Sequence, residues 1–178
     1  MLKVNDLLKS KSKRLGKDSV ISPYSSILEA IKKMTEQKID ALAVLDEGKI
    51  VGIIEKNIFL KKFFENKLID MSQPVFRIME MKVLYVSKDF TLEECLALMS
   101  NKKIFYLPVL EGDIFLDMIS LHEVAERIVE ESEYLVSHLS QYISGNLVFN
   151  SITALPTYVS ETILDTSECK KKYKELPT

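Results

Sequence analysis

Histidine and cysteine, which often carry catalysis or bind metals, are few and scattered in this chain. His122 and His138 have no cysteine or carboxylate at metal-ligand spacing, and neither has a serine or cysteine arranged as a nucleophile partner. Cys95 falls on the apolar side of an expected helix and Cys169 lies in a polar tail, so we expect no disulfide and no zinc site. Cys95 is expected to be a buried, inert thiol.

Composition excludes several further classes of function. The 178 residues include only five glycines, and they form no phosphate-binding loop and no nucleophile elbow. A net charge of -2 lacks the positive field that nucleic-acid binding needs. No stretch approaches the roughly 18 apolar residues of a membrane span, and residues 1–16 lack the apolar core of a signal peptide. We expect a cytoplasmic protein that is not an enzyme and has no nucleic-acid or membrane partner.

An internal repeat is the main architectural signal. Residues 20–34 align with residues 85–99 after a shift of about 65 positions, and the match continues to Ile54 and Ile119. Two copies are too few for a solenoid. We therefore expect the two copies to pack on each other as one compact unit.

Each copy begins with a helix-start pattern. Ser26 with Glu29, and Thr91 with Glu94, have the spacing of a capping box, in which hydroxyl and carboxylate satisfy free amide donors. Apolar residues then recur at helical spacing, which predicts one buried face on each helix. These residues are Ile27, Ala30, Ile31 and Met34 in the first copy and Leu92, Cys95, Leu96 and Met99 in the second.

A hairpin and a second helix are predicted to follow in each copy. Two short apolar runs surround an acidic, glycine-bearing turn, which is typical of a β-hairpin. The runs are 41–45 and 50–54, then 107–110 and 114–119, and the helical stretches after them are 56–66 and 121–133. With the short apolar segment before the first helix, each copy has the order β-α-β-β-α.

This repeated order resembles the CBS domain family, whose units pair through their sheets into a Bateman module. The likeness rests on VISP at 20–23, IDALAVL at 39–45, KIVGII at 49–54 and IFYLPVL at 104–110. Residues 4–8 and 133–145 are similar to the opening segment and closing helix of small stand-alone CBS-pair proteins. The resemblance implies an α+β fold of two β-α-β-β-α CBS units packed through their sheets, with flanking helices.

The resemblance also implies a division of the chain. The expected parts are an N-terminal segment (1–19), the first unit (20–68), a linker (69–84), the second unit (85–131), a C-terminal helix (132–146) and an extension (147–178).

CBS pairs commonly bind adenosine nucleotides between their units and signal energy status to a partner enzyme. In the family pattern, Ser or Thr followed three residues later by Asp holds the ribose. The first copy has Glu55 and Ile58 at these places, and Asn57 becomes an acceptor only after a one-residue shift. The second copy keeps Ser120 and has Glu123 for Asp, which moves the carboxylate out by ~1.5 Å. The resemblance therefore implies a ribose site in the second copy and its loss in the first.

Further departures count against a phosphate. Phe105 and Tyr106 stand where the subgroup often has basic or imidazole groups, and Asp117 replaces a usual glycine and adds negative charge. No cofactor is required; the candidate ligands are AMP, ADP, ATP and S-adenosylmethionine. Glu123 would hold the ribose while apolar residues line the base pocket. The ligand-binding residues that the resemblance implies are Ile21, Ser22, Ala41, Leu42, Ser120 and Glu123.

Structural interpretations stand beside these functional ones. Ser120 and Glu123 also fit a capping box ahead of Val124, and Ser22 with Pro23 fits the end of a strand. Two functions stay open: a regulatory sensor that binds an adenosine-type ligand and acts on a partner protein, or an interaction scaffold of the same architecture with vestigial clefts. A small enzyme would need a titratable constellation that the sequence does not show.

A homodimer is the expected assembly. The helix predicted over 125–143 has an apolar stripe, and the family implies that two modules cover such faces by pairing. The stripe comprises Ile128, Val129, Tyr134, Leu135, Leu139 and Ile143. Residues 147–169 are too apolar for a linker and could dock on their own module, fill a cleft, strap the dimer or await a partner. The sequence does not separate these roles.

Overall fold

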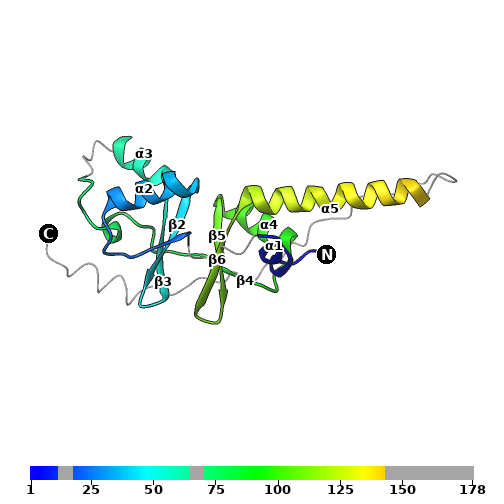
Figure 1. Ribbon diagram of the computed structural model, residues 1–178, viewed down its shortest axis with the longest axis horizontal. Helices are drawn as coiled ribbons and strands as arrows, with labels where there is room; N and C mark the ends of the chain where they lie inside the picture. Colours follow the sequence, from blue (N-terminus) through cyan, green and yellow to red (C-terminus); the bar gives the residue numbers. More distant parts are fainter. Residues whose placement is uncertain (12–17, 65–69, 143–178) are drawn as a thin grey trace.

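The fold is a tandem pair of α+β units, seen here in a computed structural model that describes residues 1–11, 18–64 and 70–142 (Figure 1). The first unit comprises β1 (Val20–Ile21), α2 (Ile27–Gln37), β2 (Ala41–Asp46), β3 (Lys49–Glu55) and α3 (Lys56–Phe64). The second comprises β4 (Val86–Ser87), α4 (Leu92–Lys102), β5 (Tyr106–Glu111), β6 (Ile114–Ser120) and α5 (Leu121–Tyr142). Helix α1 (Val4–Ser10) precedes the first unit, and the 3-10 helix η1 (Val75–Arg77) lies between the units. The predicted β-α-β-β-α order is confirmed in both copies.

Each unit has one three-stranded sheet with the same topology. The strand orders are β1-β2-β3 and β4-β5-β6, with the first pair parallel and the second antiparallel. The register shifts at Val44/Leu45 in one sheet and at Val109/Leu110 in the other, which are equivalent places in the repeat. The two sheets lie side by side in the middle of the molecule, with α2 and α3 at one end and α1, α4 and α5 at the other (Figure 1).

The predicted capping boxes begin α2 and α4. The Glu29 amide donates to Ser26 Oγ (3.2 Å) while the Ser26 amide donates to the Glu29 carboxylate (2.9 Å). Thr91 and Glu94 make the same reciprocal pair at 3.2 and 2.8 Å. Both helices also end alike, on a lysine with φ near 55°. The repeat therefore includes the helix caps, which satisfy amides and carbonyls that a helix end leaves free.

Each hairpin has the turn that its glycine permits. In the first, Glu47 and Gly48 both have positive φ, at 50° and 82°, which is the type I′ pattern. In the second, Gly112 has φ 60° at the first central position, as in a type II′ turn. Such turns match the twist of the flanking strands, which explains why two short apolar runs pair here.

Helix α1 packs on the second unit although it precedes the first in the chain. The Val4 amide donates to the Phe90 carbonyl and the Leu92 amide to the Leu2 carbonyl, each at 2.9 Å. Val4, Leu7 and Leu8 are buried with residues of α4 and the second sheet in one apolar cluster. The backbone bonds and the buried side chains fix α1 against the second unit.

The segment before the second unit makes the equivalent contacts with the first. The Ile27 amide donates to the Gln73 carbonyl and the Val75 amide to the Ser25 carbonyl, each at 2.8 Å. Val75 and Phe76 of η1 are buried against the first sheet and α2. Each unit is therefore completed by a segment that adjoins the other unit in sequence, so the two cannot separate without exposing core.

A third apolar cluster joins the two sheets. Its buried members are Ala43, Ile50, Ile53, Val83, Leu110 and Met118, which come from both units. Residues 79–80 cross the edge of β3, where Ile53 and Glu80 exchange backbone bonds of 2.9 and 2.8 Å. A side chain at Gly52 would collide there, because its Cβ would lie 2.7 Å from Met79 Sδ. A larger residue at this crossing would have to displace Met79 and press on the Glu80 carbonyl.

Helix α5 confirms the helix predicted over 125–143 through Tyr142 and joins it to the last helix of the second unit. The expected helix 121–133 and the closing helix 132–146 merge into one helix, Leu121–Tyr142, which projects beyond the second unit (Figure 1). Within the described ranges no helix is long and apolar enough to cross a membrane. The extension 147–178 lies outside the described residues.

Candidate functional site

A cavity of about 1090 Å³ lies between the two units. The first unit contributes the segments before β1 and β2 and the end of β3, and the second contributes the segments around β5 and the corner between β6 and α5. Its apolar lining comprises Ile39, Ala41, Phe105, Tyr106, Met118, Leu121 and Ala125. The size suits a ligand with a flat base and a sugar, since small-molecule pockets hold roughly 300–1,000 Å³.

The β6–α5 corner carries the predicted ribose acceptor. The Ser120 amide (2.7 Å) and Ser120 Oγ (2.8 Å) both donate to Glu123 Oε2, and the Glu123 amide donates back to Ser120 Oγ (3.2 Å). This reciprocal arrangement is a capping box at the start of α5. Ser120 and Glu123 therefore cap α5, and the Glu123 carboxylate also lines the cavity.

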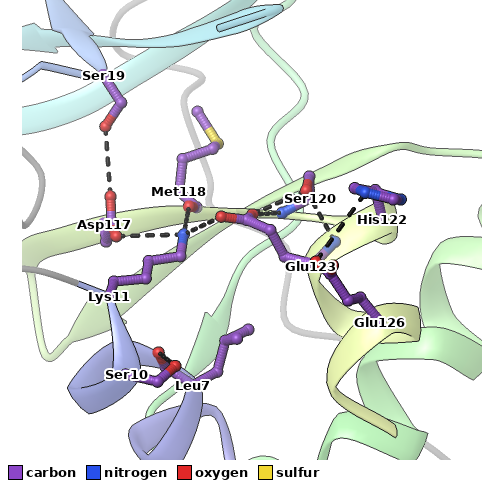
Figure 2. Close-up of polar contacts among 10 residues, drawn as sticks. All are labelled: Leu7, Ser10, Lys11, Ser19, Asp117, Met118, Ser120, His122, Glu123 and Glu126. Atoms are coloured by element: carbon purple, nitrogen blue, oxygen red, sulfur yellow. Dashed lines mark hydrogen bonds and ion pairs between the residues drawn. The ribbon is translucent and has the colours of Figure 1, made fainter. Parts of the chain in front are cut away.

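Lys11 brings an ammonium group to the same carboxylate. Lys11 follows α1, and its Nζ lies 2.8 Å from Glu123 Oε1, 3.4 Å from Asp117 Oδ2 and 2.8 Å from the Met118 carbonyl oxygen (Figure 2). The Ser19 hydroxyl, from the first unit, donates to Asp117 at 3.5 Å. One ammonium thus meets three acceptors on the second unit, at the wall of the cavity.

These contacts explain the electrostatics of Glu123. Burial alone would raise the pKa of Glu123, but the Lys11 charge and the hydrogen bonds from Lys11 and Ser120 outweigh it and lower the pKa. The carboxylate is therefore ionised at neutral pH. Asp117, the residue that replaces a usual glycine, is buried with 7% exposure and shares the Lys11 charge with Glu123.

A second polar contact joins the two units across the cavity, between Tyr106 of β5 and acidic residues of the first unit. Tyr106 has its pKa raised to about 12 by burial and by the charges of Asp40 and Glu55, and its phenol hydrogen-bonds Asp40. Asp40 also pairs with Lys56. Burial, and then the charge of Glu80, raises the pKa of Glu55. These interactions link the start of β2 to the start of β5 across the cavity.

Carboxylates outnumber ammonium groups in the cavity lining. The acidic residues are Asp18, Asp40, Glu55, Asp117 and Glu123, and the basic ones are Lys11, Lys38 and Lys56. This excess of negative charge repels a phosphate group, whereas it does not repel a neutral or cationic ligand. Among the described residues no group of three His, Cys, Asp or Glu side chains is placed to hold a metal ion.

The structure brings only part of the implied ligand set together. Ala41, Ser120 and Glu123 line the cavity between the units. Ile21 and Ser22 line a separate, smaller cavity of about 440 Å³. Leu42 is fully buried in the first unit's core and lines neither cavity, because alternate residues of a strand face opposite sides.

The first copy's counterpart of the ribose site is differently built. Ile58 is partly buried against the core of the first unit, while Asn57 is exposed and lines the cavity. Glu55 lines the cavity as well. An amide and a carboxylate therefore face the cavity from the first unit, although neither has the spacing of the second-unit pair.

Sequence reasoning missed Lys11, Asp18, Ser19 and Asp40 as cavity residues. Lys11 stands in no motif, and its place depends on α1 docking on the far unit. A signal existed only in residues 4–8, which resemble the family's opening segment and so predict a docked N-terminus.

Cys95 is free and buried as predicted, and burial, together with Glu94 and Glu93, raises its pKa to about 12.

The fold and the cavity define a tandem module of two β-α-β-β-α units that share one site. The CBS domain family matches residues 17–65 and 75–130. The matched ranges cover more than half of the chain, and the chain belongs to the CBS domain family.

Known CBS-domain proteins are similar over most of the described chain. The mitochondrial CBS domain-containing protein CBSX3 of Arabidopsis thaliana is 27% identical over 148 residues, covering 80% of this chain and 72% of that protein. A solved CBS-domain protein from Burkholderia ambifaria has a TM-score of 0.67 at 29% identity, covering 72% of this chain and 94% of its own. The CBS domain pair of protein MJ0100, solved with 5′-methylthioadenosine and S-adenosyl-L-methionine, has a TM-score of 0.60 at 25% identity, covering 74% and 98%.

Proposed function

We propose that this chain is a non-enzymatic regulatory module that binds an adenosine-type ligand between its units and transmits the bound state to a partner protein. The observation that carries the proposal is the cavity lined by both units, with the Glu123 carboxylate at its wall. A ligand there contacts both sheets at once and so changes how the units are held together. Such a change is what a partner could detect.

The charge of the cavity favours particular members of the ligand class. Glu123 accepts hydrogen bonds from the ribose hydroxyls, and the aromatic rings of Phe105 and Tyr106 offer surfaces for the base. The acidic lining favours adenosine, or the cation S-adenosylmethionine, over AMP, ADP and ATP. The MJ0100 module was solved with 5′-methylthioadenosine and S-adenosyl-L-methionine, so one relative of this chain holds ligands of this phosphate-free class.

Calorimetric titration tests the proposal. The full chain is titrated with adenosine, S-adenosylmethionine, AMP, ADP and ATP, and the expected result is binding that weakens as phosphates are added. Glu123→Gln should weaken binding, because glutamine retains the cap but loses the charge. Glu94→Gln is the matched control, since Glu94 closes an equivalent capping box outside the cavity. No heat and no thermal stabilisation with any of the ligands would contradict the proposal; a ligand at a hundred times its Kd should add about 2.7 kcal/mol.

A specific observation favours the second candidate, an interaction scaffold with vestigial clefts. Both oxygens of Glu123 are already engaged, one by Ser120 and the other by Lys11. The scaffold predicts no ligand response but a stable complex with a partner, so the same titration separates the two functions.

A homodimer is proposed as the assembly, formed through helical faces that include α5. Val129 and Tyr134 of α5 are 54% and 60% exposed, whereas Ile128 packs on the second unit. The side chains of Leu135 and Leu139, and residue Ile143, lie outside the described part of the chain. Val129→Glu should weaken the dimer in light scattering after size exclusion, and a monomeric parent chain would refute it.

A further inference from the structure

Lys11 occupies the place that a ribose would need. The Oε2 atom of Glu123 already accepts from the amide and the hydroxyl of Ser120, at 2.7 and 2.8 Å. Only Oε1 remains for an outside donor, and Lys11 Nζ lies 2.8 Å from it. A ligand hydroxyl that bonds Oε1 has to enter beside this ammonium group, so the two compete for the open side of one oxygen atom.

The position of Lys11 is fixed by the fold rather than by its own side chain. Its amide donates to the Leu7 carbonyl (3.2 Å), which makes it the C-cap of α1. Leu7 and Leu8, in the last turn of that helix, are buried in the second unit's core. The Lys11 side chain is 21% exposed, so its stem is largely covered and its charge is directed at the cavity wall.

Displacement of this ammonium has a feasible route. Lys11 Nζ already contacts Asp117 Oδ2 at 3.4 Å and the Met118 carbonyl at 2.8 Å, so these acceptors are at hand when the ammonium leaves Glu123. It would not be left buried without a partner, which is the costly outcome for a charge. A shift of the side chain toward Asp117 is therefore enough to free Oε1.

We infer that Lys11 is an intramolecular competitor for the Glu123 carboxylate and sets which ligands the cavity accepts. The inference rests on the proposed function. A ligand that reaches Glu123 only through ribose hydroxyls has to displace Lys11, so its apparent affinity is lowered by the strength of the ion pair. Binding also releases the C-terminal end of α1 from Glu123, which ties occupancy of the cavity to the N-terminal segment.

Adenosine is the probe that tests this competition, because it has the ribose but no phosphate that Lys11 could attract. Lys11→Met keeps the apolar stem and removes the charge, and it should tighten adenosine binding about fivefold, the scale of a partly exposed ion pair. Lys11→Gln, also uncharged, should act in the same direction. Lys9→Met is the matched control, since Lys9 is exposed on the same helix and does not line the cavity. Its adenosine affinity should equal that of the parent chain.

A second measurement examines the contact without any ligand. Carbon-13 NMR of the Glu123 carboxyl should show a higher pKa in Lys11→Met than in the parent, because a neighbouring positive charge is lost. An unchanged pKa would overturn the inference. So would equal adenosine affinity in both proteins, or weaker binding in Lys11→Met, while the proposed function would stand. Adenosine binding to neither protein would overturn the proposed function and the inference with it.

Discussion

Replacing Gly52 with alanine should destabilise the chain, because a second segment crosses directly over this residue. A Cβ atom there would lie 2.7 Å from Met79 Sδ and 3.0 Å from the Glu80 carbonyl oxygen. The sulfur can move, but the carbonyl belongs to backbone that bonds Ile53 at 2.9 and 2.8 Å. Overpacking costs about 1–3 kcal/mol. Each of the two backbone bonds adds up to ~1 kcal/mol if it is weakened, so we expect a loss of about 1–5 kcal/mol.

Urea unfolding of the full chain, followed by circular dichroism, measures this loss. Met79→Ala provides the matched background, because it removes the atoms nearest to the new methyl group. Gly52→Ala should then cost less in the Met79→Ala protein than in the parent, which a double-mutant cycle detects. A loss below about 0.5 kcal/mol in the parent, within the range of ordinary surface substitutions, would refute the close approach of the two segments.

Three further predictions follow from the buried and ionised groups. The pKa of Glu123 is lowered from 4.5 in the folded chain, so its carboxylate stabilises the fold above pH 4.5, and this stabilisation is lost as the pH falls through the folded-state pKa. Glu123→Gln should therefore reduce the free energy of unfolding at about pH 7. In a series of urea unfolding curves at decreasing pH, the stability of this variant should fall less steeply than that of the parent. Leu42→Ala should lower the free energy of unfolding by about 2–5 kcal/mol in the same assay, because Leu42 is fully buried. If the variant still binds adenosine with the parent's affinity, Leu42 belongs to the core and not to the ligand site. In a Cys169→Ser chain, Cys95 should resist thiol reagents at neutral pH until denaturant is added, since burial raises its pKa to about 12; fast labelling of the native chain would contradict this.

The repeated elements were predictable because their signals are local. Ser26 with Glu29 satisfies amides within one helical turn, and the glycine-bearing turn sets the hairpin between β2 and β3. The same patterns recur in the second copy, so two independent signals supported one fold. Local chemistry of this kind depends on only a few neighbouring residues, and a single sequence contains it in full.

The cavity was only partly predictable because its walls come from distant parts of the chain. Ala41 and Glu123 face it, whereas Ser22 lines another cavity and Leu42 turns into the core. Neighbouring residues on a strand point to opposite faces of the sheet, so adjacent residues of one motif cannot all line the same cavity. Lys11 depends on α1 crossing to the second unit, for which the one signal is the resemblance of residues 4–8 to the family's opening segment.

The two copies place different groups at the same position of the fold, and the difference gives the cavity its asymmetry. Gly52 and Asp117 are equivalent in the repeat, and each meets the segment that crosses from the neighbouring unit. At Gly52 the crossing segment lies so close that a Cβ atom would be 3.0 Å from the Glu80 carbonyl oxygen. At Asp117 the crossing segment instead presents the Lys11 ammonium, and a carboxylate receives it. Gly52 thus permits close packing of the crossing segment, whereas Asp117 forms an ion pair with it. The same ammonium contacts Glu123 beside it, so the copy that carries the proposed ribose acceptor is also the copy in which the chain supplies its own cation.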